Sequence, residues 1–416
     1  MDLSAQSCPH FFHSDRVHLC HRGGHDAEAA SGSDDSGYFG ALRSYCTLLP
    51  LGMAVKKVFV LAGEASGDVL GAEFLSALIE AQPDLEISYT GGPAMERVLD
   101  GATPLISMEH MAFMGFAEVV RHLKKIWGND QIIKAHLKDE RPDLVVLVDY
   151  PGYNLRLAKW LDKKGFRRSG TRVVQVVCPQ FWAWKPGRLT LLQTYLDAVY
   201  PLLPFEAKLL SQASVVAPYY GHPAAQRVAA GGWNPSGPLA LLPGSRAQEF
   251  AQHVRIFAET AQQLKREAHW FRPAHIPDAE YLEILSSFGV HVRPEDVKSG
   301  VPGMTGYSGA LVASGTATLE VALRGVPMVV AYKTSALSYA IGKRVIRVPY
   351  ISLVNLILQR AAVAECIQSD CHPKVLAPAL LQAMSDLTWP QTVTELRQSI
   401  DQGDPFPMIA RHASHL

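Results

Sequence analysis

The feature that most constrains the fold is a short, mostly apolar run that recurs along the chain and is followed each time by a turn and a helical pattern. Val58–Ala62, Leu144–Val148 and Val173–Val177 are examples. Strands buried on both faces give continuous apolar runs, and their alternation with helices is typical of parallel sheets covered by helices. We therefore expect an α/β protein, with ligands bound beyond the carboxyl ends of the strands.

Chain length and turn residues predict two such domains. A chain of 416 residues exceeds the size at which a single core stops growing. Gly and Pro are densest between Tyr220 and Pro238, where we expect the hinge. The expected segments are a leader at 1–52, a first domain at 53–221, a second domain at 222–385, and a C-terminal helix or tail at 386–416 that could return to the first domain.

The first 52 residues differ from the rest because they are rich in His, Ser, Gly and Asp. The cysteines and histidines between Cys8 and His25 are zinc-ligand types, but their spacing matches no common zinc pattern. A disordered leader, or translated sequence upstream of a start at Met53, is the simpler expectation. We leave this segment out of the fold.

Composition excludes several classes of protein. The chain carries 39 Lys and Arg against 39 Asp and Glu, so it lacks the basic excess of a nucleic-acid-binding protein. No apolar run is long enough for a membrane span, and the N-terminus lacks the apolar region of a signal peptide. The six cysteines form no regular framework, which favours a reduced, cytoplasmic setting.

Two turns in the second half have the form of anion sites. After the strand that ends near Pro243, Gly244 and Ser245 turn into a long helix, so free backbone N–H groups and the guanidinium of Arg246 point at the turn. Ser314, Gly315 and Thr316 open a second helix in the same way. Either turn alone is equally consistent with an ordinary strand-to-helix connection.

The first half offers acidic and hydroxyl side chains at strand ends. Glu64, Ser66 and Asp68 follow the first strand, and Asp149 ends another, so all four are expected to face the crevice. The glycines of this loop do not have the G-x-G-x-x-G spacing, so a nicotinamide enzyme is disfavoured.

Together, these motifs resemble the lipid-A-disaccharide synthases, bacterial inverting glycosyltransferases of the GT-B type, in which two Rossmann-like domains face each other across a cleft. The resemblance covers about residues 55–390. It rests on the following runs, which occur in the family's order: Leu61–Asp68, Gly91–Met95, Met114–Glu118, Val148–Asn154, Cys178–Trp184, Leu203–Glu206, Gly221–Pro223, Leu242–Arg246, Ser314–Glu320, Pro327–Val330 and Ser352–Asn355.

The resemblance implies an enzyme that joins UDP-2,3-diacylglucosamine to 2,3-diacylglucosamine 1-phosphate (lipid X) through a β-1,6 bond with inversion, and releases UDP. It also implies a cytoplasmic protein, peripheral on the inner face of the inner membrane, whose partners are these substrates and an anionic membrane surface. No cofactor and no nucleic acid is expected, and a homodimer is left open.

Inverting glycosyl transfer needs a base at the acceptor hydroxyl and positive charge at the departing diphosphate. Asp149 is the candidate base, as the resemblance also implies, although an aspartate here could instead cap the following helix. Asp68 is the second candidate. Arg246, with the Gly244 and Ser245 amides, is the candidate diphosphate clamp.

The resemblance further implies that Glu320 binds the ribose hydroxyls and that Asn355 lines the nucleotide side. No Asp-x-Asp motif stands at a predicted strand end. We therefore predict no metal site and expect Arg246 and helix dipoles to take the place of Mg²⁺.

A candidate membrane contact lies between the strands of the first half. Its apolar residues share one helical face, and basic residues flank them, as in interfacial amphipathic helices. A core-facing helix with a solvated basic edge is the alternative. The predicted contact residues are Phe116, Val119, Val120, Leu123, Ile126 and Trp127.

The chain departs from the family pattern at Gly152, Gln180, Ser308 and Val354, and it fits the family poorly over His269–Pro294. Two other functions stay open. One is another UDP-sugar GT-B transferase, such as a peptidoglycan N-acetylglucosaminyltransferase, whose glycine-rich N-terminal loop is missing here. The other is a non-catalytic lipid- or nucleotide-binding homologue, against which the presence of both Asp149 and Arg246 argues.

Overall fold

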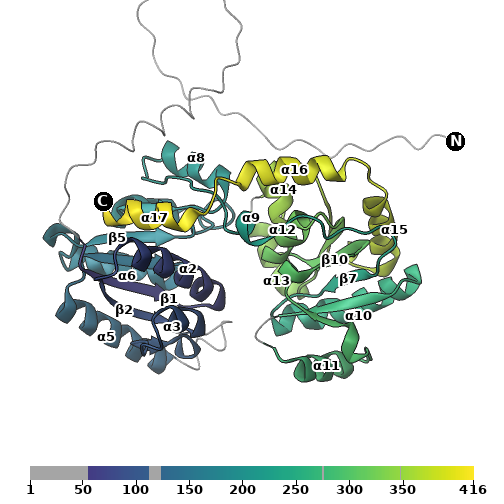
Figure 1. Ribbon diagram of the computed structural model, residues 1–416, viewed down its shortest axis with the longest axis horizontal. Coiled ribbons are helices and arrows are strands. Elements are labelled where there is room, and N and C mark those ends of the chain that lie inside the picture. The colour runs from purple at the N-terminus through teal and green to yellow at the C-terminus, as the bar shows by residue number, and fades with distance from the viewer. Residues whose placement is uncertain (1–54, 112–122, 274–275, 347) are drawn as a thin grey trace, which may run out of the picture. The chain divides into compact units, whose positions relative to one another are not determined.

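The computed structural model describes residues 55–111, 123–273, 276–346 and 348–416 (Figure 1). These residues form two α/β halves, each built on a six-stranded parallel sheet. The N-terminal segment 1–52, with its Cys and His cluster, lies outside the described residues.

The first sheet has the strand order β3-β2-β1-β4-β5-β6. The order reverses between β1 and β4, so their carboxyl ends form the topological switch point at which such sheets bind ligands. Its strands are β1 (Lys57–Ala62), β2 (Glu86–Gly91), β3 (Ile106–Ser107), β4 (Leu144–Val148), β5 (Arg172–Val176) and β6 (Ala198–Tyr200).

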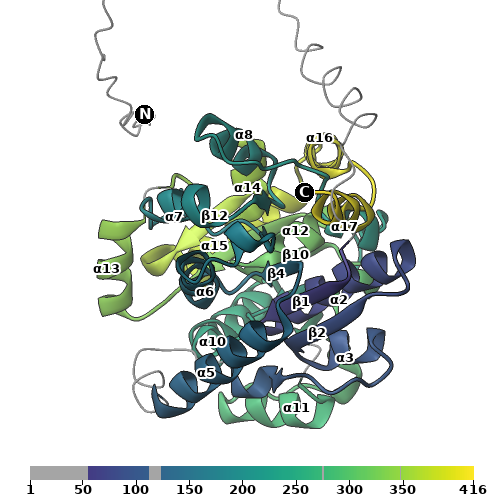
Figure 2. The ribbon, with the colours of Figure 1, turned by 90° about the vertical axis from the view of Figure 1, so that its left-hand side faces the viewer.

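Helices cover both faces of this sheet, which explains the continuous apolar runs of its central strands β1 and β4. Val58 and Val60 of β1 pack into one cluster, and Phe59 and Leu61 into another on the opposite face. Figure 2 shows α2 on one side of β1 and α5 and α6 on the other. The helices of this half are α2 (Ala65–Ala81), α3 (Pro93–Val98), α5 (Leu123–Glu140), α6 (Pro151–Lys163), α7 (Arg188–Tyr195) and α8 (Pro204–Gln212).

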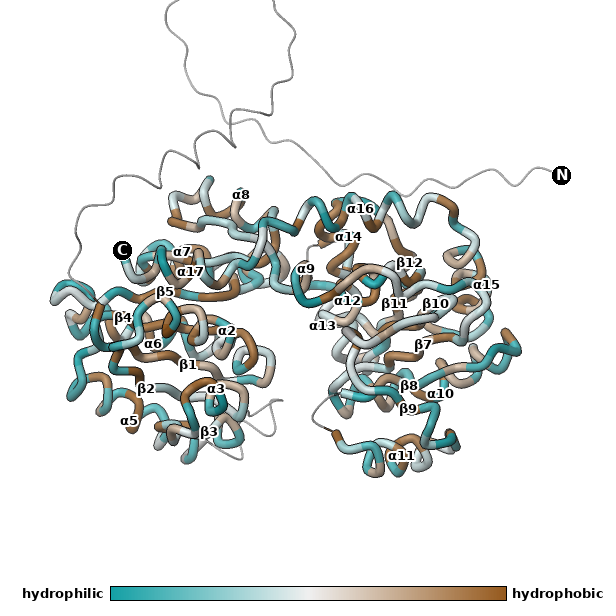
Figure 3. Tube along the Cα trace, in the orientation of Figure 1, coloured by the Kyte–Doolittle hydropathy of each residue, from teal (hydrophilic) through white to brown (hydrophobic). Residues whose placement is uncertain are grey.

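The second sheet repeats the first. Its order, β12-β11-β10-β7-β8-β9, places the switch point between β7 and β10. Figure 3 shows hydrophobic residues along β7 as along β1. Its strands are β7 (Leu239–Leu242), β8 (Ala268–Arg272), β9 (Val297–Ser299), β10 (Gly309–Ala313), β11 (Met328–Tyr332) and β12 (Ala364–Ile367). Its helices are α10 (Ala247–Leu264), α11 (Asp278–Ser287), α12 (Thr316–Leu323), α13 (Ala336–Val345), α14 (Leu353–Leu358), α15 (Pro373–Met384) and α16 (Trp389–Ile400).

Two chain segments run between the halves. The first contains Gly221, whose φ of +103° and close approach to the Gln402 backbone exclude a side chain, and the short helix α9 (Ala224–Arg227). There the His222 N–H donates to the Ile400 carbonyl over 2.9 Å. The second leads to α17 (Pro405–Ser414), which packs against α2 of the first half. We propose the boundary between the halves at 221/222.

Among the helices of the described ranges, none combines the length and apolarity needed to cross a bilayer.

Candidate active site

Asp149 stands at the switch point of the first sheet, directly after β4. It and Tyr150 both have left-handed backbone conformations, with φ of +48° and +46°. Each such non-glycine residue costs on the order of 1–3 kcal/mol, and this strain is found where the surroundings hold a functional residue in place. The N-cap of α6 is Tyr150, and no side chain caps that helix. Asp149 is therefore not the helix cap that the sequence left as an alternative.

Two buried amides hold the Asp149 backbone. Nε2 of Gln175, on the neighbouring strand β5, donates to the carbonyls of Asp149 over 3.0 Å and Val177 over 3.2 Å. Nδ2 of Asn154 also donates to the Asp149 carbonyl. Both amide side chains are completely buried. Sequence reasoning missed both, although a glutamine within the apolar run of β5 was a visible signal.

Polar groups after β1 surround the Asp149 carboxylate. The Ser66 hydroxyl donates to Oδ2 of Asp149 over 3.0 Å. Burial raises the pKa of the half-buried Glu64 carboxyl, the negative charge of Asp149 raises it further, and the positive charge of Arg246 lowers it. Glu64 therefore interacts electrostatically with both proposed catalytic residues, one from each half.

The loop after β1 lies close against the Asp149 turn. A Cβ atom at Gly63 would lie 2.5 Å from Cδ1 of Tyr150, and one at Gly67 would lie 3.4 Å from the Val148 carbonyl oxygen. The Tyr150 hydroxyl donates to the Met111 carbonyl over 3.1 Å. Gly63 is therefore required because the Tyr150 ring occupies the space of a side chain.

Asp68 belongs to the frame of the site. It is buried, and its carboxylate accepts from the backbone N–H groups of Gly92 and Ala94 over 2.8 Å each and of Met95 over 3.2 Å. Both oxygens are thus engaged at the start of α3. We assign Asp68 to holding this loop, in place of the base or substrate contact expected from the sequence.

The turn after β7 has the form expected of a phosphate loop. Gly244 has φ of +116°, and a Cβ there would lie 2.8 Å from a Glu249 carboxylate oxygen. Ser245 and Arg246 are exposed at the start of α10, an 18-residue helix whose first N–H groups lack helical partners. Within the described residues, the one ion pair of the Arg246 guanidinium is with Glu249, over 3.5 Å.

His253 fixes this loop from behind, and sequence reasoning missed it. Its Nδ1 lies 3.0 Å from the Pro243 carbonyl oxygen, and its Nε2 accepts from the Lys333 N–H over 3.0 Å. This pattern places the ring proton on Nδ1. Burial lowers the pKa of His253 and thereby favours the neutral ring that these bonds require.

The turn after β10 lies at the same switch point as the turn after β7. Gly315 is the N-cap of α12, Thr316 is exposed at its first position, and the Ser314 hydroxyl donates to the Ile351 carbonyl over 2.9 Å. One turn further, Glu320 is half-buried. Burial raises the pKa of its carboxyl, and Arg227 opposes that rise. A partly desolvated carboxylate here is suited to accept hydrogen bonds from a ligand's hydroxyl groups.

Asn355 is occupied within the protein. Its Nδ2 donates to Val363 over 2.9 Å and to Glu365 over 2.8 Å, and its Oδ1 accepts from Ala362 over 2.8 Å and Val363 over 2.9 Å. The side chain is buried and joins α14 to β12. We therefore assign Asn355 to positioning this part of the second half, in place of the nucleotide contact that the resemblance implied.

The predicted membrane contact is only partly visible. Phe116, Val119 and Val120 lie outside the described residues, and so does the side chain of Leu123. Trp127 of α5 is 67% exposed, whereas Ile126 lines a small cavity beside Tyr150 and Tyr153. Ile126 therefore faces inward and is removed from the predicted contact face.

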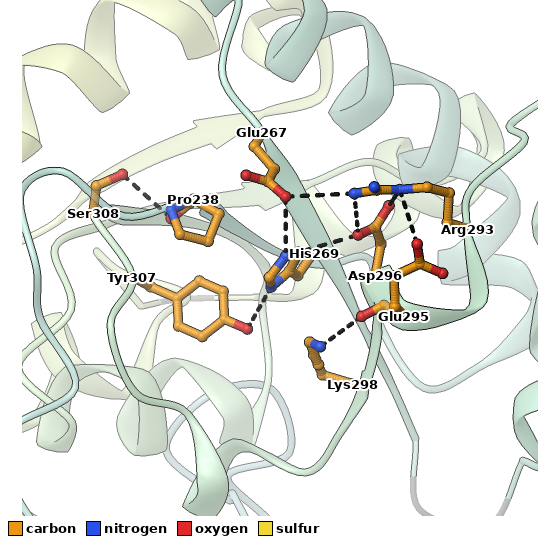
Figure 4. A network of polar contacts seen from close by, with 9 residues as sticks. All are labelled: Pro238, Glu267, His269, Arg293, Glu295, Asp296, Lys298, Tyr307 and Ser308. Carbon is orange, nitrogen blue, oxygen red and sulfur yellow. Dashed lines mark hydrogen bonds and ion pairs between the residues drawn. The ribbon is translucent and has the colours of Figure 1, made fainter.

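A second polar network lies at the amino ends of β8 and β9 (Figure 4). Glu267, His269 and Asp296 are near enough to one another to hold a metal ion. However, the guanidinium of Arg293 already ion-pairs with Asp296 over 2.9 Å and with Glu267 over 3.5 Å. Nδ1 of His269 bonds the Tyr307 hydroxyl over 2.9 Å. These contacts link β8 to β9 at the amino ends of the strands, whereas the phosphate loops follow the carboxyl ends.

A cavity of about 220 Å³ lies among α2, α9 and α17. Glu73 and Arg227, which line it, form an ion pair over 3.3 Å. None of the predicted site residues lines it, so it is separate from the candidate active site.

The two six-stranded parallel sheets and their switch points define the two-domain GT-B fold. The solved glycosyltransferase of kitacinnamycin matches with a TM-score of 0.54 at 14% identity and covers 86% of this chain and 98% of its own. The calicheamicin glycosyltransferase CalG4 matches with a TM-score of 0.51 at 16% identity, over 87% of this chain and 97% of its own. These matches confirm the expected fold.

Sequence relatives narrow the class to a family. The lipid-A-disaccharide synthetase family model matches residues 58–404. The lipid-A-disaccharide synthase of Pseudomonas fluorescens (strain Pf0-1) is 36% identical over 79% of this chain and 89% of its own length. That of Coxiella burnetii (strain Dugway 5J108-111) is 30% identical over 88% of this chain and 99% of its own. The chain belongs to the lipid-A-disaccharide synthetase family and is a glycosyltransferase.

Proposed function

We propose that this enzyme transfers the sugar of UDP-2,3-diacylglucosamine to the 6-hydroxyl of 2,3-diacylglucosamine 1-phosphate, with inversion and release of UDP. The single observation that carries the proposal is the environment of Asp149. It ends β4 at a switch point, on a backbone held by two buried amides, and its carboxylate is engaged by Ser66 alone among the described hydrogen-bond donors. This leaves carboxylate lone pairs for a substrate hydroxyl.

Asp149 accepts the proton of the acceptor's 6-hydroxyl as that oxygen attacks the anomeric carbon of the donor. The new carbon–oxygen bond forms on one face of the sugar while the bond to UDP breaks on the other, which inverts the configuration.

The diphosphate is stabilised from the second half. Arg246 is exposed and weakly paired, and the free N–H groups of Ser245 and the first turn of α10 face the same turn. A guanidinium and a helix N-terminus together bind the charge that develops as UDP leaves. Ser314, Gly315 and Thr316 support the nucleotide from the neighbouring turn, and Glu320 accepts hydrogen bonds from the ribose hydroxyls.

We also propose that the protein acts at the cytoplasmic face of an anionic membrane, because both substrates carry acyl chains. Support comes from α5, where Trp127 is 67% exposed and Ile132 is 48% exposed. Exposed aromatic and aliphatic residues on a helix with lysines suit the interface of a bilayer. The Trp127→Ser variant is expected to sediment less with phosphatidylglycerol vesicles than the Leu387→Ser variant, a matched change at a residue 87% exposed near α16.

The test of the reaction is UDP release by the purified enzyme with matched acceptors. We expect turnover with 2,3-diacylglucosamine 1-phosphate and none with the non-acylated sugar phosphate or with a peptidoglycan-type lipid acceptor. Product analysis by NMR would show the β configuration. Turnover with the peptidoglycan-type acceptor alone would reassign the substrate, and tight UDP binding without turnover on any acceptor would favour a non-catalytic homologue.

A further inference from the structure

A pair of basic residues between β5 and the start of α7 has no role in the steps above. Lys185 and Arg188 both lie against the indole ring of Trp184, with Nζ of Lys185 at 4.1 Å and Cζ of Arg188 at 4.9 Å from its centroid. The Arg188 N–H donates to the Lys185 carbonyl over 3.0 Å, so the two residues close a single turn. The aromatic ring thus holds two positive charges together.

The loop that carries this pair is firmly anchored. Nε1 of Trp182 donates to the buried Glu206 over 3.0 Å, and the Trp182 ring packs edge-on against Phe205. Phe181 and Ala183 are buried on either side. Trp184 is the residue of this stretch that turns outward, with 37% exposure. The basic pair is therefore presented by a fixed support.

Topology brings the pair to the edge of the sheet where Asp149 lies. The loop leaves β5, the strand next to β4, and the Asp149 N–H donates to the Val176 carbonyl over 2.9 Å. Gln175 ties the carbonyls of Asp149 and Val177 together. In addition, α7, which begins at Arg188, packs against α6, which begins two residues after Asp149.

The charges of the pair are not neutralised within the described residues, where neither cation has an ion pair with a carboxylate. Arg188 is half-buried, and burial lowers the pKa of its guanidinium. A partly desolvated cation without a counter-ion favours an anionic ligand. Arg246 is the residue that we assign to the donor diphosphate, so we consider a second anion for this pair.

We propose that Lys185 and Arg188 bind the 1-phosphate of the acceptor and so select a phosphorylated acceptor sugar. This inference rests on the proposed function, because that function supplies an acceptor with a phosphate monoester. The carbon that bears the phosphate and the carbon that bears C6 both flank the ring oxygen of the acceptor. With its 6-hydroxyl at Asp149, the acceptor therefore keeps its phosphate within the width of one sugar ring of that residue. Arg188 binds two phosphate oxygens, and Lys185 adds a second charge.

The test compares the phosphorylated acceptor with the same lipid lacking the phosphate, for Arg188→Ala, Arg188→Lys and Lys185→Ala. Lys159→Ala, a change at an exposed lysine of α6, is the control. For Arg188→Ala we expect kcat/KM for the phosphorylated acceptor to fall roughly 10- to 100-fold, the equivalent of one charged hydrogen bond. The donor KM and kcat/KM for the dephosphorylated acceptor should stay within about twofold, and Arg188→Lys should recover part of the loss.

The proposal would be overturned if Arg188→Ala lowered kcat/KM equally for both acceptors, or if it raised the donor KM. The proposal would also be overturned if Arg188→Ala or Lys185→Ala no longer sedimented with phosphatidylglycerol vesicles but kept the wild-type preference for the phosphorylated acceptor. The pair would then bind lipid headgroups. Direct binding separates this inference from the proposed reaction. If the wild-type protein gives no turnover, calorimetry with a short-chain 2,3-diacylglucosamine 1-phosphate still decides, because the proposal requires binding that Arg188→Ala weakens and Lys159→Ala retains.

Discussion

Replacing Gly63 by alanine should damage catalysis through Tyr150. A Cβ at this position would lie 2.5, 2.7 and 2.8 Å from three carbons of the Tyr150 ring, whereas ordinary contacts begin near 3.4 Å. The ring must therefore retreat by almost 1 Å. Since Tyr150 directly follows Asp149 and shares its left-handed backbone, the catalytic carboxylate should move with it.

The expected size of the effect follows from this overlap. Overpacking of a well-packed site costs typically about 1–3 kcal/mol. A displacement of about 1 Å at a reacting group can lower turnover on the order of 10²-fold. UDP affinity should change little, because Arg246 and the α10 N-terminus lie on the other half. The assays are UDP release, thermal unfolding and UDP calorimetry.

Gly152→Ala is the matched control, because a Cβ there meets nothing within 4 Å although Gly152 lies three residues after Asp149. It should keep wild-type turnover and stability. The double variant Gly63→Ala/Tyr150→Ala should relieve the overlap and restore part of the stability. If Gly63→Ala released UDP as fast as Gly152→Ala, the close approach would not position the base.

Three further predictions concern charge and protonation. Arg246→Ala should weaken UDP binding roughly 10- to 100-fold in calorimetry while Gln248→Ala does not; equal affinities would move the phosphate site elsewhere. Burial raises the pKa of Glu206 to about 8, so the folded state binds a proton that the unfolded state has lost. The free energy of unfolding, measured relative to that of Glu206→Gln, should therefore fall as pH rises from about 5 to about 8. A difference between the two proteins that does not change with pH would contradict this. Burial lowers the pKa of His222 to about 4, so between about pH 6.5 and 4 the unfolded state binds a proton that the folded state does not. The free energy of unfolding should therefore fall as pH drops through this range, and it should fall less in His222→Asn. The same pH dependence in the wild type and in His222→Asn would refute this.

The architecture was predictable because it depends on pattern. The five-residue apolar runs at Val58–Ala62 and Leu144–Val148 lie within β1 and β4, and the turn at Gly244 has the conformation that its glycine suggested. Strand β3 was not predicted, because Ile106–Ser107 is too short to carry a period.

The roles of single polar residues were less predictable. Asp68 and Asn355 lie near the starts of helices α2 and α14, where a side chain can bind either a ligand or a neighbouring loop. Both accept hydrogen bonds from backbone N–H groups of other segments. Only tertiary structure distinguishes the two roles. His253 was missed because its partners, Pro243 and Lys333, come from separate connections brought together by the fold.

The most direct test of the central claim is UDP release by Asp149→Asn with saturating donor and acceptor. The amide keeps the size of the side chain and can still accept from Ser66, but it cannot take a proton. We predict that kcat falls by about 10²–10⁴ while UDP affinity and thermal stability stay near those of the wild type. Near-normal turnover in this variant would contradict the assignment of Asp149 as the base.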